Sequence, residues 1–168
     1  SLLFSASKQD CISLANQLLT DGASVDARDR LGNMPLAMAA RHGHVEIVKQ
    51  LLEFNAPLNA RNLDASTALF LATEDERRAA ADVLLAAGAD PNIPGRSGLT
   101  PISAAAYTGN TDLVALLLAK GADPKALDAT GKTAIIYAAG RGFAPVVKLL
   151  LDHGIDVNSR LGNNLSAL

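Results

Sequence analysis

Residues 96–126 read RSGLTPISAAAYTGNTDLVALLLAKGADPKA, and this stretch decides the fold. Gly98 closes a turn. Thr100 and Pro101 mark a helix start, because a threonine hydroxyl caps the first turn and proline suits the first helical position. Gly109 ends that helix with a residue that adopts the left-handed conformation at little cost. A second helix follows through LVALLLA and stops at Gly121. The stretch therefore predicts two short helices joined by a tight corner.

The same pattern returns along the whole chain. Gly88, Gly121 and Gly154, each after a second helix, lie 33 residues apart. Pairs of leucines recur in the same step, at Leu18-Leu19, Leu51-Leu52, Leu84-Leu85, Leu117-Leu118 and Leu150-Leu151. A period shared by so many units indicates a repeat architecture, in which each unit buries its apolar face against its neighbours. The leucine pairs predict second helices near residues 44–54, 78–87, 111–120 and 144–153.

The residues TPIS-AA-Y-TGN-LV-LLL-GAD resemble the ankyrin repeat, and the resemblance covers the whole chain. It implies an all-α ankyrin-repeat solenoid of stacked helix-turn-helix units with β-hairpin-like loops. We expect a single domain over residues 1–168. Its units are a partial repeat at 1–27, repeats at 28–60, 61–93, 94–126 and 127–159, and the start of a sixth at 160–168. The family's TPLH tetrapeptide reads MPLA, TALF, TPIS and TAII here, so the usual Thr–His hydrogen bond is in question.

Composition agrees with a thin core of alanine and leucine. Aromatic residues make up 4% of the chain, tryptophan is absent, and the single cysteine, Cys11, excludes an intrachain disulfide. No apolar run approaches the ~18–20 residues of a membrane span, and no signal peptide is visible. We expect a soluble protein, cytoplasmic by default unless an upstream export signal was removed. Neither terminal repeat carries a polar outer face, so we expect a fragment of a longer array or ends that are covered.

Repeat 4 follows the family pattern most closely, and repeat 3 departs from it most. Glu76 stands in the column of the corner glycine, and Ala65 stands where the turn glycine is expected. A non-glycine residue held at positive φ costs on the order of 1 kcal/mol. We therefore expect repeat 3 to be the least stable internal repeat, unless the chain takes another path at these corners.

No group of residues makes a catalytic constellation. His42 and His44 form a His-x-His pair without the further ligands that zinc needs. The acidic corner Glu74-Asp75-Glu76 lacks a calcium-type loop, and Cys11 has no histidine in its own repeat. We expect no catalytic residue, no cofactor and no metal site.

The resemblance implies that a protein partner binds the concave face, made of hairpin tips and the exposed end of each first helix. These positions vary from repeat to repeat, whereas the leucine and glycine columns do not. The candidate partner-binding residues are Arg28, Arg30, Leu31, Asn33, Arg41, Arg61, Leu63, Ser66, Arg96, Leu99, Tyr107, Leu127, Lys132 and Arg141.

Charge divides unevenly between these tips and the rest of the chain. The five hairpin segments (27–33, 60–66, 93–99, 126–132 and 159–165) carry a net +3, and the remaining sequence carries −5. Arginine suits bidentate contact with carboxylates, so the tips favour a partner with an acidic segment. Nucleic acid is disfavoured, because the chain is not basic overall and offers few aromatic rings for stacking. Two functions remain: a non-catalytic adaptor, scaffold or inhibitor, and the targeting arm of an enzyme whose catalytic domain lies outside this chain.

Overall fold

The computed structural model describes residues 2–155. Within them lie ten α-helices, one short 3-10 helix and no strand. The chain forms two compact units, Ser1–Asp90 and Pro91–Leu168, and each is described by itself. The all-α repeat architecture is confirmed.

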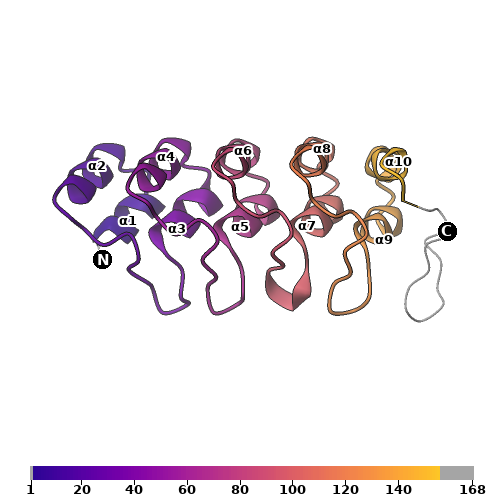
Figure 1. Ribbon diagram of the computed structural model, residues 1–168, viewed down its shortest axis with the longest axis horizontal. Coiled ribbons are helices and arrows are strands. Elements are labelled where there is room, and N and C mark those ends of the chain that lie inside the picture. Colours follow the sequence, from indigo (N-terminus) through magenta and orange to yellow (C-terminus); the bar gives the residue numbers. More distant parts are fainter. Residues whose placement is uncertain (1, 156–168) are drawn as a thin grey trace. The chain divides into compact units, whose positions relative to one another are not determined.

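Unit 1 consists of three helix pairs (Figure 1). The first helices of the pairs lie side by side in one layer and the second helices in another, while the loops extend from the first-helix side. The first helices are α1 (Leu2–Lys8), α3 (Pro35–His42) and α5 (Ala68–Glu74). The second helices are α2 (Ile12–Thr20), α4 (Val45–Glu53) and α6 (Arg78–Ala86).

Unit 2 repeats this plan with two helix pairs. The 3-10 helix η1 (Arg96–Gly98) forms a hairpin tip, and α7 (Pro101–Thr108) pairs with α8 (Thr111–Ala119). The second pair is α9 (Ala134–Gly140) and α10 (Ala144–Asp152). The four second helices predicted from the leucine pairs therefore begin and end within one or two residues of their expected bounds.

The helix starts follow the sequence pattern. Thr67 and Thr100 cap α5 and α7, each accepting a hydrogen bond from the backbone N–H three residues on. The Thr100 hydroxyl also donates to the hydroxyl of Ser103, at 3.0 Å. Ser103 stands at the fourth position of TPIS, where the family has histidine. A local hydroxyl pair therefore occupies the place of the family's Thr–His contact.

Buried columns of small and branched residues hold the pairs together. Ile47, Val48 and Leu51 of α4 are fully buried, as are Leu113, Val114 and Leu117 of α8. Facing them, the first helices bury alanines such as Ala40 and Ala106, and these short side chains let the helices approach closely. Truncating one of the buried leucines to alanine costs about 2–5 kcal/mol. The thin core is thus built as the composition predicts.

The non-glycine corners keep the left-handed backbone. Glu76 has φ 59° and Ala65 has φ 63°, so the chain does not take another path in repeat 3. Asp10 adopts φ 57° in the same column as Glu76, and Asn55 adopts φ 57° in another column, that of the glycine after the second helix. Repeat 4 holds a single such residue, Ser97, also at φ 57°. Repeat 3 therefore carries two strained positions where repeat 4 carries one.

Amide hydrogen exchange checks the cost of these positions. We expect faster exchange in residues 64–78 than in residues 97–111, because local opening relieves strain at Ala65 and Glu76. Equal protection of the two segments would contradict the expectation.

Substitution in the turn column gives a second test. Ala65→Gly should raise the free energy of unfolding by roughly 1 kcal/mol, because glycine adopts positive φ without a Cβ clash. Gly131→Ala is the matched control in the same column, at φ 75° with open space around the added Cβ. It should lower the stability by a similar amount in urea unfolding. A stabilising Gly131→Ala or a destabilising Ala65→Gly would refute the strain.

Candidate protein-binding surface

The hairpin tips are shaped by a side chain at their first position. The Oδ1 atom of Asp29 accepts the N–H groups of Leu31 and Asn33, at 2.9 and 2.8 Å. Asn62 caps its tip in the same way, and so does Asp128. These residues share one sequence column, and the side-chain bonds fix each tip without using its outward-facing residues.

The tip of repeat 4 corrects the expectation that this repeat is the most regular. Gly95 stands in the capping column and has no side chain to accept the tip N–H groups. The tip instead turns through two successive left-handed residues, Ser97 and Gly98, at φ 57° and 71°. Its backbone still closes, since Gly95 N–H donates to the Leu99 carbonyl at 2.9 Å.

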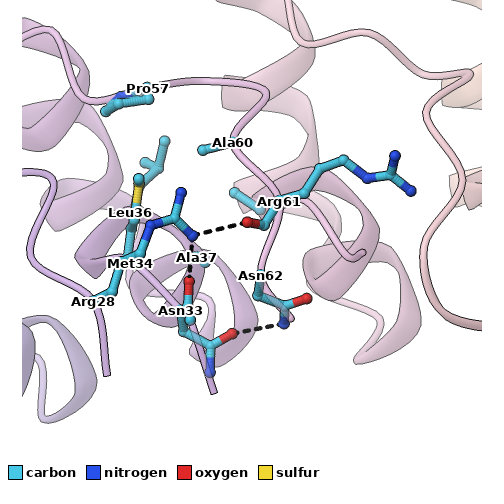
Figure 2. Close-up of a pocket in the computed structure, with 11 residues that line it drawn as sticks. Arg28, Asn33, Met34, Leu36, Ala37, Pro57, Ala60, Arg61 and Asn62 are labelled. Carbon is cyan, nitrogen blue, oxygen red and sulfur yellow. Dashed lines mark hydrogen bonds between the residues drawn. The ribbon is translucent and has the colours of Figure 1, made fainter. Parts of the chain in front are cut away.

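Neighbouring tips of unit 1 are tied together by hydrogen bonds. The Leu63 N–H donates to the Leu31 carbonyl at 3.0 Å. The Asn62 amide donates to Asn33 Oδ1 at 2.8 Å, and Arg28 Nη1 donates to the carbonyls of Gly32 and Arg61 at 2.7 and 2.8 Å. Figure 2 shows Arg28 reaching from one tip to the next. The guanidinium of Arg28 is therefore a structural link between tips.

Two further candidate residues belong to this framework. Asn33 and Ser66 are 4% and 2% exposed, and Asn33 also donates to Asp29 Oδ2 at 3.1 Å. Their side chains cannot form a contact surface, so we remove them from it. The cavity beside Arg28 in Figure 2 holds only about 10 Å³, which is room for about one water and no larger ligand.

The tip residues that face outward in unit 1 are arginine and leucine. Arg30 is exposed, and Leu31 and Leu63 are 59% and 77% exposed. Arg61 is exposed as well, while its Nε donates to the Ala65 carbonyl of its own tip at 2.8 Å. Apolar and cationic side chains therefore alternate along the tips, as the sequence predicts.

The ends of the first helices form the second half of this surface in unit 1. Arg41 Nε lies 2.8 Å from Asp75 Oδ2, an ion pair between adjacent repeats. Arg77 Nε donates to the Arg41 carbonyl at 3.2 Å, and a Cβ on Gly43 would lie 3.0 Å from Arg77 Cδ. The corner glycine thus makes room for the side chain that the next repeat places over it.

A groove of about 490 Å³ lies between tips and helix ends in unit 1. It has both charge and apolar surface, and its lining comes from three repeats. The lining residues are Phe4, Lys8, Asp29, Leu31, Asn33, Met38, Arg41, His42, Asp75 and Arg77.

His42 lines this groove, and its surroundings lower its pKa. Burial lowers the pKa of His42 below 6.5, and His44, Arg41 and Lys8 lower it further, against an opposing effect of Asp75. The His42 ring stacks on His44, with the ring centroids 5.7 Å apart. Its Nε2 atom is buried without a hydrogen-bond partner among the described residues. Protonation would therefore place a charged N–H where nothing accepts it.

In unit 2 the tips are also joined, by the Ala129 N–H donating to the Ser97 carbonyl at 3.2 Å. The outward residues are Leu127, 60% exposed, the exposed Arg96 and the half-buried Leu99. At the first-helix ends, Tyr107 is 46% exposed. Of the remaining candidates, Arg141 lies over the Tyr107 ring and Lys132 lies over the Tyr137 ring.

These side chains gather with two others into what we call the tyrosine–arginine cluster: Tyr107, Tyr137, Arg141, Lys132 and Phe143. The rings of Tyr107 and Tyr137 meet edge to face at 5.9 Å. Arg141 Cζ lies 4.3 Å from the Tyr107 ring centroid and 5.7 Å from that of Phe143. Lys132 Nζ lies 5.6 Å from the Tyr137 centroid. Two cations are thus held on aromatic faces.

Tyr137 and Phe143 are not among the candidate residues that the sequence predicts. Tyr137 stands in the column of Met38, Leu71 and Ala104, which are all buried, so its position indicates core. The available signal was a polar hydroxyl in an otherwise apolar column. That hydroxyl donates a hydrogen bond to Asp128 Oδ2.

The described residues 2–155 hold no group of three or more histidine, cysteine or acidic side chains arranged to bind a metal ion. Within the same range, no helix has the length and apolar character needed to cross a bilayer.

The pKa of His42 predicts a loss of stability in acid. Because the folded-state pKa is lowered, the unfolded chain takes up a proton first as the pH falls through about 6.5, and unfolding is favoured. Wild-type stability should therefore decline between about pH 7.5 and about pH 5.5. His42→Gln should flatten that decline in urea unfolding, whereas the same change at His153 in unit 2 serves as the substitution control. A His42→Gln chain with the full wild-type decline would contradict the assignment.

Comparison with known proteins agrees with this geometry. A family model described as ankyrin repeats (3 copies) matches residues 2–95 and 92–160. No curated protein matches the chain. The matched residues span most of the sequence and contain all the helix pairs described above. The chain belongs to the ankyrin repeat family.

Proposed function

We propose that this chain is a non-catalytic interaction module that holds a protein partner on its hairpin face, and that the partner contributes an acidic segment. The hairpin face means the outward tip residues together with the exposed ends of the first helices. Ankyrin repeats are generally protein–protein interaction modules. The observation that carries the proposal is the row of exposed arginines and leucines on the hairpin tips, beside which a groove of about 490 Å³ lies in unit 1.

The charges in that groove favour an anion. Asp29 is engaged by backbone N–H groups of its own tip, and Asp75 is paired with Arg41. The acidic side chains are therefore satisfied within the fold. Lys8 and Arg77 line the same groove, and carboxylates suit such cationic donors.

Apolar contact is available next to this charge. Leu31 lines the groove and is 59% exposed, and Leu63 on the next tip is 77% exposed. Interfaces combine an apolar centre with a polar rim. The charges mainly raise the association rate and select the partner, and their effect weakens with salt.

Charge reversal at the tips tests the proposal. Arg30→Glu, Arg61→Glu and Arg96→Glu together should weaken capture of the partner at least about tenfold in low salt. The partner is first identified from a cell extract with the wild-type chain and then purified for the measurement. Because Arg61 Nε bonds the Ala65 carbonyl, thermal unfolding should show a slightly lower midpoint but an intact fold.

Lysines on the second helices provide the matched control. Lys49 and Lys148 are exposed and pair with Glu46 and Asp152 of their own helices. Charge reversal at Lys49, Lys120 and Lys148 should leave partner binding unchanged. If this control abolishes binding while the arginine variant binds normally, the partner uses the second-helix face and the proposal is wrong.

A further inference from the structure

Two of the candidate arginines of unit 1 are engaged within the fold. Arg28 donates to two carbonyls, and Arg41 is paired with Asp75. These contacts reduce what the two side chains can offer a partner. A tight anchor for an acidic group therefore has to be sought among cations that are held in place but not neutralised.

Arg141 in unit 2 meets that description. Its guanidinium lies 4.3 Å from the Tyr107 ring centroid and 5.7 Å from that of Phe143. Phe143 is itself fixed, because its ring packs on Gly109, where an added Cβ would lie only 2.6 Å from the ring. Among residues 2–155 no acidic side chain forms a salt bridge with Arg141. A guanidinium that packs on aromatic rings can still present N–H donors to a carboxylate.

Lys132 completes the cationic side of the cluster. Its Nζ lies 5.6 Å from the Tyr137 centroid. The adjacent Asp128 does not compete for it, because its carboxylate accepts from Tyr137, from Thr130 and from the Lys132 backbone N–H. Burial alone would raise the pKa of Asp128, but these hydrogen bonds outweigh burial and lower it. The aspartate therefore stays ionised and internally satisfied.

Exposed apolar surface comes from Tyr107, which contacts Arg141, and from Leu127, which lies on the same tip as Lys132. Tyr107 is 46% exposed and Leu127 is 60% exposed. Tyrosine and arginine are the residue types most often found at the energetic centre of interfaces, since they give large contact area with a polar end. The cluster would fit an extended segment that has an acidic side chain next to an apolar one. The acidic side chain complements the cations, and the apolar side chain complements the exposed apolar surface.

We infer that the tyrosine–arginine cluster is the anchor for the acidic segment, with Arg141 binding a glutamate or aspartate carboxylate and Tyr107 packing against a neighbouring apolar side chain of the partner. The inference rests on the proposed function and deepens it. It moves the main contribution to affinity from the tip arginines to one cluster in unit 2.

The chain supplies its own probe for this site. It contains two tyrosines and no tryptophan, and both tyrosines belong to the cluster. Intrinsic tyrosine fluorescence of the full chain therefore reports on this place alone. The ligand is a short synthetic peptide of glutamate and leucine without aromatic residues. A glutamine–leucine peptide and a glutamate–serine peptide of equal length test charge and apolar contact separately.

The glutamate–leucine peptide should change the fluorescence and saturate, and both comparison peptides should bind at least about tenfold more weakly. Arg141→Gln should weaken binding about tenfold or more, and Arg141→Lys should restore little, because lysine lacks the planar donor edge. Tyr107→Phe should bind nearly as well as wild type, since the ring face is kept. Lys148→Gln, on the second helix of the same unit, is the control and should have no effect.

Three outcomes would overturn the inference: wild-type affinity in Arg141→Gln with an intact fold by circular dichroism, equal binding of the glutamine–leucine peptide, or no binding by any peptide at millimolar concentration. The proposed function is judged separately by capture of the full partner. If capture depends on the tip arginines but not on Arg141, the hairpin face remains the binding surface and only the anchor is wrong. If capture depends on the second-helix lysines, both proposals fail.

Discussion

The fold depends on a left-handed residue after every helix. The corner between the two helices of a pair has φ between 57° and 77° at Asp10, Gly43, Glu76, Gly109 and Gly142. Glycine is the residue that takes this conformation without cost, yet Asp10 and Glu76 are held there too. The left-handed backbone at this corner is therefore kept even where a non-glycine side chain makes it costly. The turn places the next residue over the preceding repeat, where Arg77 crosses Gly43 and Phe143 crosses Gly109. Without this reversal, the first helices of a unit would not lie in one layer, and no hairpin face would form.

Most of this architecture could be predicted from the sequence because it rests on a period. Leucine pairs and glycines at a step of 33 residues give the second helices to within one or two residues. The threonine and proline column gives the starts of α5 and α7. The strained positions were also readable, since Ala65 and Glu76 break a glycine column and the structure keeps positive φ at both. The shape of the repeat 4 hairpin could not be predicted. The capping role of Asp29, Asn62 and Asp128 is evident only from their hydrogen bonds to the tip N–H groups.

The candidate site was harder to predict, because the type of a residue does not give the direction of its side chain. Arg28 and Arg30 lie in one tip and both are exposed, yet the Arg28 guanidinium bonds two carbonyls of the fold. Asn33 and Ser66 vary between repeats as contact residues do, but both are buried. Residues in one column can therefore differ between repeats for two reasons. Some side chains have different hydrogen-bond partners within the fold, and others face outward. Tyr137 illustrates the opposite error, since it occupies a buried column and still presents its ring to Lys132.

In the hairpin tips, one residue fixes the backbone and other residues face outward. Asp29 and Asn62 hold their tips through backbone N–H groups, so the shape of each tip does not require an apolar side chain between cap and turn. Leu31 and Leu63 stand at such positions and are 59% and 77% exposed. A polar side chain would serve the tip equally well and would leave less apolar area in water, which at about 25 cal/mol per Å² is a real cost. Contact with the proposed partner would remove this cost. The same reasoning applies to Leu127 in unit 2, which lies on the tip capped by Asp128 and is 60% exposed.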